Sequence, residues 1–196
     1  MKRKTFDALL VTGGLVLAAV LLLAGCLLTW AHGFVNNEIH SQLAAEKVFF
    51  PPAGSAAINE PGVAPHLNKY AGQQLVNGDQ AKAYADHFIA VHLQSIGGGQ
   101  TYAQLSTKAQ ADPNNTVLAG QVATVFRGET LRGLLLNAYA YGKMAQIAGY
   151  AAIVSFLGAA LLLILAALGF LHLRRTDPET ELGESGAPRE PAVDLV

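Results

Sequence analysis

The chain has 196 residues and a formal net charge of −1, and 52% of its residues are hydrophobic while only 14% are charged. Proteins that bind nucleic acid carry a marked excess of Lys and Arg, so this balance gives no electrostatic reason to expect nucleic acid as a partner. The composition directs attention to the distribution of the apolar residues along the chain.

Two long segments, residues 8–31 and 144–173, contain no Asp, Glu, Lys or Arg. A helix needs about 20 apolar residues to cross a bilayer, and backbone groups within hydrocarbon satisfy their hydrogen bonds inside a helix. Two such runs would need a very large soluble core to bury them, so we interpret both as transmembrane helices. The sequence predicts an all-α membrane protein in which two transmembrane helices flank a mainly helical extracytoplasmic domain, with the lipid bilayer as partner.

The basic residues next to these segments predict their orientation. Residues 2–4 are Lys-Arg-Lys, and Arg174 and Arg175 follow the second segment. Clusters of Lys and Arg near helix ends stay on the cytoplasmic side, so both termini of this multi-pass cell-membrane protein are expected there. The predicted regions are a basic cytoplasmic N-terminus (1–7), transmembrane helix 1 (8–31), the extracytoplasmic helical domain (32–143), transmembrane helix 2 with its outer extension (144–173) and a disordered acidic cytoplasmic tail (174–196).

Cys26 is the only cysteine, so no disulfide can form within the chain. Residues 23–26 read Leu-Ala-Gly-Cys, which resembles the lipobox of bacterial lipoproteins, whose cysteine is lipidated after signal cleavage. Against cleavage, the apolar sequence continues through residues 27–31, whereas the apolar part of a cleavable signal runs for about 7 to 15 residues. An uncleaved anchor is the favoured interpretation, and lipidation at Cys26 is the alternative.

The predicted extracytoplasmic domain opens with an extension of the first helix. Phe34, Ile39 and Leu43 recur near helical spacing, and no proline interrupts the chain before Pro51. Residues 49–65 contain several Pro and Gly without a periodic apolar pattern, so an irregular loop is expected there.

Capping residues predict the next two helices. The triplet Asn77-Gly78-Asp79 predicts a turn followed by a helix cap, and the glycines at 97–99 mark the end of that helix. Thr101 caps a second helix, which Asp112 and Pro113 end.

A third amphipathic stretch covers residues 117–126, and we expect an interruption or kink around Gly128. From Glu129 the apolar pattern continues into the second transmembrane segment without a proline. The second membrane helix is therefore also expected to extend outward.

Small residues within the membrane segments predict how the two helices meet. Ala151, Ser155 and Ala159 recur at every fourth position, as do Gly14 and Ala18. Side chains of this size allow a close approach between helices in a bilayer. An alanine-rich composition without such packing is the alternative.

The histidines form no recognisable metal motif. His87 and His92 are five residues apart, so on a helix they diverge by about 140°, whereas paired ligands are usually four apart. A site assembled from distant segments stays open for two neighbouring pairs, His40 with Glu38 and His87 with Asp86. No catalytic residue, metal ligand or cofactor is predicted.

The densest polar patch lies at residues 127–133. Glu129 and Arg132 are three apart and can pair on a helix surface, which contributes about 0.3 kcal/mol. One interpretation is a salt-bridged bend in the chain. The other makes Arg127, Glu129 and Arg132 an interaction surface for the 49–65 loop or for a partner protein.

Three stretches, residues 49–52, 81–89 and 126–140, resemble a family of uncharacterised actinobacterial two-span membrane proteins. The resemblance covers nearly the whole chain except the acidic tail and implies no established activity. Some members carry the label aromatic ring-opening dioxygenase, an activity that requires iron held by histidine and carboxylate ligands. The sequence does not supply such an arrangement.

We therefore expect a non-enzymatic membrane-anchored protein that presents a helical domain outside the cell membrane. Its expected role is that of an accessory subunit of an envelope complex, with a membrane protein or a second copy of itself as partner. The alternative from another class is a ligand sensor or an enzyme that acts with a partner.

Overall fold

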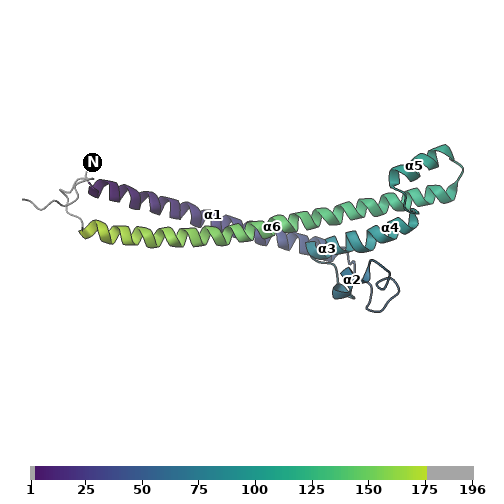
Figure 1. Cartoon of the computed structure of the whole chain (residues 1–196), viewed down its shortest axis with the longest axis horizontal. Coiled ribbons are helices and arrows are strands. Elements are labelled where there is room, and N and C mark those ends of the chain that lie inside the picture. Colours follow the sequence, from purple (N-terminus) through teal and green to yellow (C-terminus); the bar gives the residue numbers. More distant parts are fainter. Residues whose placement is uncertain (1–2, 176–196) are drawn as a thin grey trace, which may run out of the picture. The chain divides into compact units, whose positions relative to one another are not determined.

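The computed structural model describes residues 3–175, of which about 80% are helical, and this part of the chain contains no strand. The predicted acidic tail from residue 176 onward lies outside the described residues. The elements, shown in Figure 1, are α1 (Arg3–Ala45), α2 (Ala64–Leu67), the 3-10 helix η1 (Asn68–Tyr70), α3 (Gly78–Tyr84), the π-helix η2 (Ala85–Ile89), α4 (Ala90–Ile96), α5 (Tyr102–Ala111) and α6 (Thr116–Arg175).

The chain divides into two compact units, to both of which α1 and α6 contribute. The described part of unit 1 comprises residues 3–29 and 150–175, and unit 2 comprises Trp30–Gly149. Unit 1 consists only of the paired ends of the two long helices, whereas unit 2 holds every shorter element.

Small side chains hold the antiparallel helix pair of unit 1 together. On α6, Ala152, Ala159 and Ala166 are at most 6% exposed, and on α1 Ala18 is fully buried. Gly25 packs so closely that an added Cβ would lie 2.8 Å from the Phe156 ring. The expected close approach of these helices is confirmed.

The buried stripe on α6 follows a seven-residue repeat. Ala152, Ala159 and Ala166 are buried, whereas Ala151 and Ser155 of the predicted four-residue pattern are only half-buried. A seven-residue repeat keeps one seam facing a neighbouring helix because two helical turns contain about seven residues. The predicted small-residue contact is therefore confirmed at Ala18 on α1 and at Ala159 on α6, whereas Ala151 and Ser155 are only partly buried.

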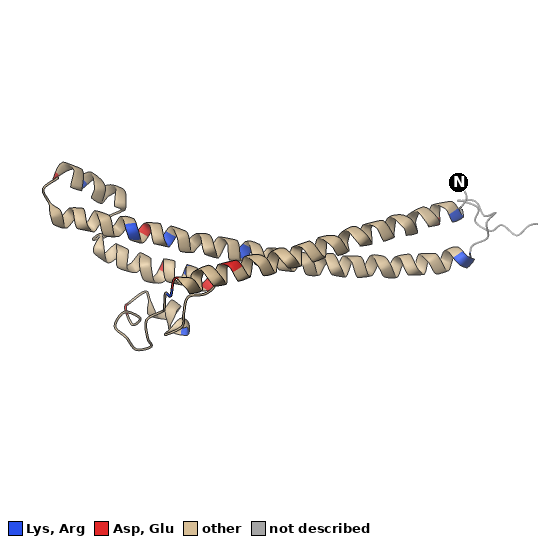
Figure 2. Ribbon diagram, turned by 180° about the vertical axis from the view of Figure 1, so that it is seen from behind, with Lys and Arg blue, Asp and Glu red and all other residues tan. Residues whose placement is uncertain are grey.

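The outer surface of unit 1 is apolar. Large side chains such as Leu23 and Leu157 are 67% and 66% exposed, respectively. In Figure 2 the basic residues of unit 1 stand at the start of α1 and at the end of α6, and most of the remaining ribbon of unit 1 carries no charged residue. Both helices are long and apolar enough to cross a membrane.

Hydroxyl groups in the two apolar segments bond to their own helices. Thr12, Thr29 and Ser155 each donate to the backbone carbonyl four residues earlier, at 2.8 Å. This arrangement leaves no Ser or Thr hydroxyl of these segments without an acceptor.

Unit 2 has its own hydrophobic core. Its largest fully buried side chains come from the 46–63 loop, from α2 and from the segment before α3: Phe50, Ile58, Val63, Leu67 and Leu75, all at most 1% exposed. The 46–63 loop is fastened to the chain before α3 by backbone bonds from Phe50 to Gln73 and from Leu75 to Val48, each 2.9 Å. The loop predicted from its prolines is thus irregular and yet packed.

The capped helices form as predicted. The Asn77 side chain accepts from the Gln80 backbone N–H at 2.9 Å at the start of α3. Thr101 forms a capping box with Gln104 at the start of α5. The glycines after α4 adopt positive φ, 58° at Gly98 and 74° at Gly99, which reverses the chain without steric cost.

The expected interruption at Gly128 is wrong. The helix α6 runs through this position without a break from Thr116 to Arg175. A Cβ added at Gly128 would lie 2.4 Å from Leu93 Cδ2 and 3.0 Å from its Cγ. The glycine therefore serves a close contact between α6 and α4, since helix breaking is only a weak tendency of Gly inside a long helix.

Candidate functional site

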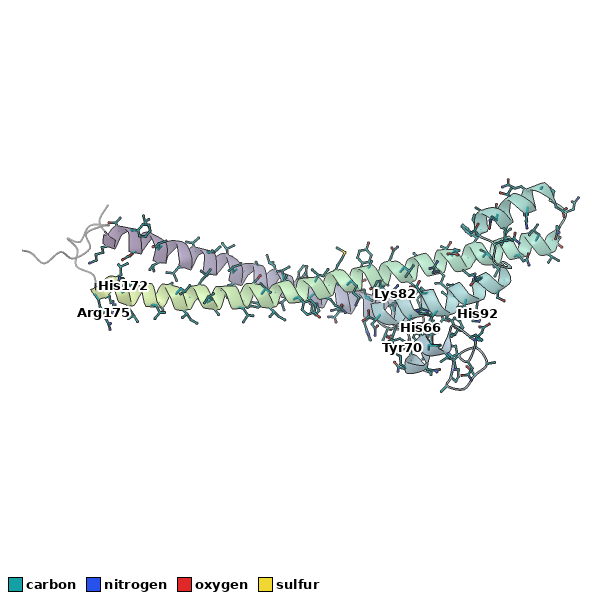
Figure 3. The ribbon with its side chains drawn as sticks, viewed as in Figure 1. His66, Tyr70, Lys82, His92, His172 and Arg175 are labelled. Atoms are coloured by element: carbon teal, nitrogen blue, oxygen red, sulfur yellow. The ribbon has the colours of Figure 1, made fainter. Side chains whose placement is uncertain are left out.

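A polar cleft of about 350 Å³ opens on unit 2 between α2, η1, α3, η2 and α6. Figure 3 shows His66, Tyr70 and Lys82 in this region, where α2 lies beside α3. The lining residues are Pro65, His66, Lys69, Tyr70, Asp79, Lys82, Ala83, His87 and Tyr139. Basic and aromatic side chains thus dominate the cleft.

One wall of the cleft is built by a π-helical turn. The helix that starts at Gly78 switches at Ala85–Ile89 to π-helical bonding and returns to α-helix at Ala90. Such turns often accompany functional sites because they change the direction in which neighbouring side chains point. Here the turn carries Asp86, which faces α6, and His87, which faces α2.

His87 stacks on His66 across the cleft. The two imidazole rings are nearly parallel, with centroids 3.5 Å apart and an interplanar angle of 7°. Burial lowers the pKa of His87 from its ordinary value, and the neighbouring His66 lowers it further. Both effects favour the neutral form of His87.

Asp86 is the centre of an ion-pair network behind the cleft. Its carboxylate accepts from Lys82 on the same helix and from Arg132 on α6, the latter at 3.2 Å. The hydrogen bond from Lys82 is the main reason that the pKa of Asp86 lies below its ordinary value, and the same bond raises the pKa of Lys82. Asp86 is therefore ionised and neutralised by its partners.

A second ion pair joins Asp79, which lines the cleft, to α6. Lys143 Nζ lies 2.9 Å from Asp79 Oδ1, and the same ammonium sits 5.3 Å from the centroid of the Tyr139 ring. Lys82 approaches the same ring at 5.2 Å. The Tyr139 ring is thus held between two ammonium groups by cation–π attraction.

The predicted interaction surface takes part in this network through one residue. Arg132 bonds Asp86 and also pairs with Glu129 at 3.5 Å, as the three-residue spacing predicts. Arg127 is exposed, and no ion pair involves it within residues 3–175. A role for Arg127, Glu129 and Arg132 in partner binding stays a prediction.

The remaining sequence candidates have other neighbours. His92 bonds the Phe88 carbonyl at 2.8 Å and lies 3.5 Å from Glu60, away from the His66–His87 stack. Glu38 accepts from Gln42 at 2.6 Å. No group of three or more metal-ligating side chains occurs within the described residues.

Cys26 lies in the middle of α1 and is exposed. Its neighbour Gly25 is buried against Phe156 of α6. Helix packing thus accounts for the small residue before the cysteine, independently of a lipobox.

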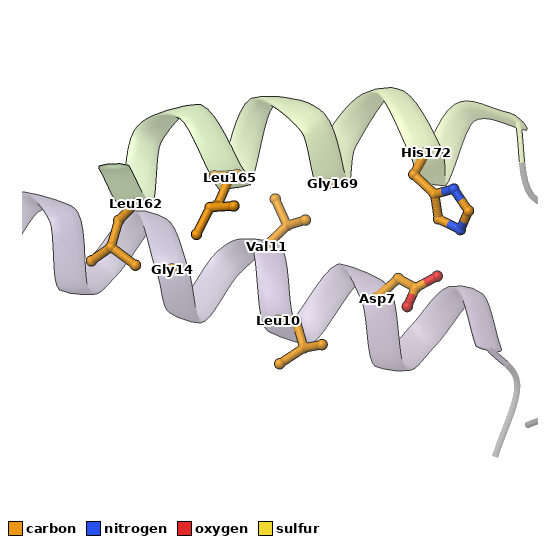
Figure 4. Close-up of a pocket in the computed structure, with 9 residues that line it drawn as sticks. Asp7, Leu10, Val11, Gly14, Leu162, Leu165, Gly169 and His172 are labelled. Atoms are coloured by element: carbon orange, nitrogen blue, oxygen red, sulfur yellow. The ribbon is translucent and has the colours of Figure 1, made fainter. Parts of the chain in front are cut away.

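A separate cavity of about 310 Å³ lies between α1 and α6 in unit 1, with Asp7 and His172 at one end (Figure 4). Its other lining residues are aliphatic or glycine: Leu10, Val11, Gly14, Leu162, Leu165, Ala166 and Gly169. This lining presents few groups that recognise a polar ligand, so the cleft of unit 2 is the better candidate site.

Sequence reasoning missed the pairing of His66 with His87 and the contact between Asp86 and Arg132. Both join residues that are far apart in the chain, 21 positions for the histidines and 46 for the ion pair. The nearest local signal in the sequence is the neighbouring pair Asp86 and His87, for which a site assembled from distant segments is one interpretation.

Comparison with known proteins adds no assignment: no family model matches the chain, and neither a curated protein nor a solved structure is similar to it.

Proposed function

We propose that the protein is anchored in the cell membrane by unit 1 and presents unit 2 on the extracytoplasmic side. The observation that carries this proposal is the inverted surface of unit 1, whose small residues face inward while its large apolar residues face outward. Water would penalise this surface at about 25 cal/mol per Å² of exposed apolar area, whereas hydrocarbon does not.

The local chemistry of unit 1 supports the same placement. Its Thr and Ser hydroxyls bond to helix carbonyls, and Lys4, Arg174 and Arg175 stand at its ends. Basic residues thus lie next to the N-terminal and the C-terminal end of the helix pair, which favours the cytoplasm for both chain termini. Trp30, 67% exposed and stacked on Phe34 at 5.5 Å, is suited to the opposite interface.

The packing of α1 also favours an anchor that is retained rather than cleaved. Cleavage before Cys26 would remove Val11, Ala18 and Gly25, the α1 residues that fill the seam with α6. The second membrane helix would then lose its partner. Lipidation at Cys26 remains the alternative to this anchor.

Site-specific cysteine labelling tests the topology. In a Cys26→Ser background, single cysteines replace exposed Lys108 of α5 or exposed Thr5 of α1. A membrane-impermeant maleimide is expected to label Lys108→Cys in intact cells and Thr5→Cys only after permeabilisation. Labelling of both positions in intact cells, or of neither, would contradict the two-span arrangement.

For the activity, we propose an accessory subunit of an envelope complex that binds a membrane protein or a second copy of itself. The apolar segments 8–31 and 144–173 contain no Asp, Glu, Lys or Arg that could line a transport path, which favours the exposed domain as the working part. Purification in mild detergent should retain a stoichiometric partner. A chain that elutes as a single copy would contradict this role.

The cleft of unit 2 favours a second candidate function, that of a ligand sensor or an enzyme acting with a partner. Its lining of His66, His87, Lys69 and two tyrosines offers hydrogen-bond donors at a concave surface. Membership of the actinobacterial two-span family stays a prediction for this protein.

A further inference from the structure

The acidic groups around the cleft of unit 2 are already neutralised. Asp79, which lines it, pairs with Lys143 at 2.9 Å, and Asp86 behind it is shared by Lys82 and Arg132. These carboxylates therefore have little capacity left to neutralise another cation in the cleft.

Three donor side chains that face the same cleft have no such partner. Within residues 3–175, the Lys69 ammonium has a single side-chain contact, the Tyr70 ring at 4.7 Å, and no carboxylate. The ring nitrogens of His66 and His87 likewise have no hydrogen-bond partner in this part of the chain, because the two rings touch only face to face. The cleft thus holds more donors than acceptors.

We propose that this cleft binds a small molecule through an oxyanion, a carboxylate or a phosphate group. Lys69 and the imidazole N–H groups of His66 and His87 bind the oxyanion, while the Tyr70 and Tyr139 rings border the remainder of the ligand. The volume, about 350 Å³, falls within the range of small-molecule sites. This inference rests on the second candidate function, the ligand sensor, and is independent of the membrane topology.

The π-helical turn explains why the donors converge. It places Asp86 toward Arg132 of α6 and His87 toward His66 of α2 in adjacent positions. The ion pair between Asp86 and Arg132 holds the π-helical turn against α6, and the stacked ring of His87 supplies a donor to the cleft. A site on a rigid element is held more precisely than one on a loop.

The affinity of the cleft for an anion should depend on pH, because a bound anion stabilises the protonated imidazole of His87. The charged groups that face His66 and His87 are Lys69 of η1, Lys82 of α3, Asp86 of η2 and Asp79, the last already paired with Lys143 of α6. In the free protein, burial and the neighbouring ring disfavour the imidazolium of His87. A bound oxyanion offsets this effect, so binding strengthens as the pH falls.

Calorimetric titration of the full chain in nonionic detergent tests the proposal, with inorganic phosphate, succinate and chloride as probes. Saturable binding of phosphate or succinate is expected, stronger at pH 6 than at pH 8, and the preferred probe identifies the oxyanion. Chloride serves as the control for charge alone. Absence of saturable binding by both oxyanions at pH 6 would overturn the proposal.

Substitutions locate the site. Lys69→Ala and His66→Phe are each expected to weaken binding about tenfold. Lys69→Ala removes a charge-assisted hydrogen bond, and His66→Phe keeps a ring that can stack on His87 but removes the ring N–H donors. Lys108→Ala is the matched control, because Lys108 is also exposed and lies on α5 outside the cleft. Equal weakening by Lys108→Ala would show non-specific attraction and refute the site. Thermal unfolding of each variant verifies that it folds, and the membrane labelling result does not affect this outcome.

Discussion

The stacked imidazoles of His66 and His87 give unit 2 a titratable contact between α2 and η2. Their rings lie 3.5 Å apart, and the pKa of His87 is lowered by burial first and by His66 second. A base whose pKa is lower in the folded chain is protonated more readily in the unfolded chain. Acidification therefore favours unfolding at this contact.

His87→Gln should reduce the loss of stability on acidification. Above about pH 7, His87 is neutral in both states and adds no pH dependence; as the pH falls through 6.5, the unfolded chain binds the proton first and stability is lost. The Tm of the wild-type protein in detergent should thus fall more steeply between about pH 7 and pH 5 than that of the variant. Parallel Tm profiles for the two proteins would contradict this assignment.

At the scale of single residues, the sequence predicted what local chemistry decides. The cap at Thr101 and the helix start within residues 77–79 were predicted, because a capping side chain bonds a backbone N–H only three residues away; the structure assigns the second cap to Asn77. The partner of His87 was not found, because it depends on how the 46–63 loop and α2 pack against α3. The same holds for Arg132, whose local partner Glu129 was predicted and whose distant partner Asp86 was not.

At the scale of elements, the contact between α6 and α4 again separates what local sequence predicts from what tertiary packing decides. Gly128 reads as a helix breaker in the sequence, although the structure uses it for space beside Leu93, which is only 7% exposed. Helix existence followed from the apolar pattern, whereas continuity through Gly128 and the π-helical turn depend on packing between helices. These features carry no periodic signal of their own.

Gly128→Leu should destabilise unit 2 by about 1–3 kcal/mol. The new Cβ would lie 2.4 Å from Leu93 Cδ2, so α4 and α6 must separate or Leu93 must leave its rotamer. The gain in helix propensity, about 0.8 kcal/mol, is too small to offset this overpacking. Thermal unfolding followed by circular dichroism measures the change.

Gly120→Leu is the matched control on the same helix. Nothing lies within 4 Å of a Cβ added at Gly120, so only the gain in helix propensity remains and Tm should rise slightly. A similar increase in the Tm of both variants would show that Leu93 can move aside without loss of stability. In that case the notion that Gly128 serves close packing would fail.

At the scale of the whole molecule, the two long helices contribute both to the apolar hairpin of unit 1 and to the folded domain of unit 2. The sequence predicted both apolar segments and their extensions, because hydropathy and the absence of proline are visible along the chain. Of the positions it predicted for the seam, Ala18 and Ala159 are buried. It did not predict Ala152 and Ala166, because alanine is frequent along α6 and packing selects which alanines are buried. The seam bears on the proposed retention of the anchor, because its α1 residues Ala18 and Gly25 precede Cys26.

Gly25→Leu therefore tests both the hairpin and the retained anchor. A Cβ at this position would lie 2.8 Å from the Phe156 ring, so the substitution should lower stability by about 1–3 kcal/mol, and Phe156→Ala in the same chain should restore part of the loss. Gly13→Leu is the control, because nothing lies within 4 Å of its added Cβ. Tm values in detergent and the intact mass of each purified chain are measured together. If the chain were cleaved before Cys26, the mature protein would lack residue 25, its mass would show the loss, and no coupling with Phe156 would be observed.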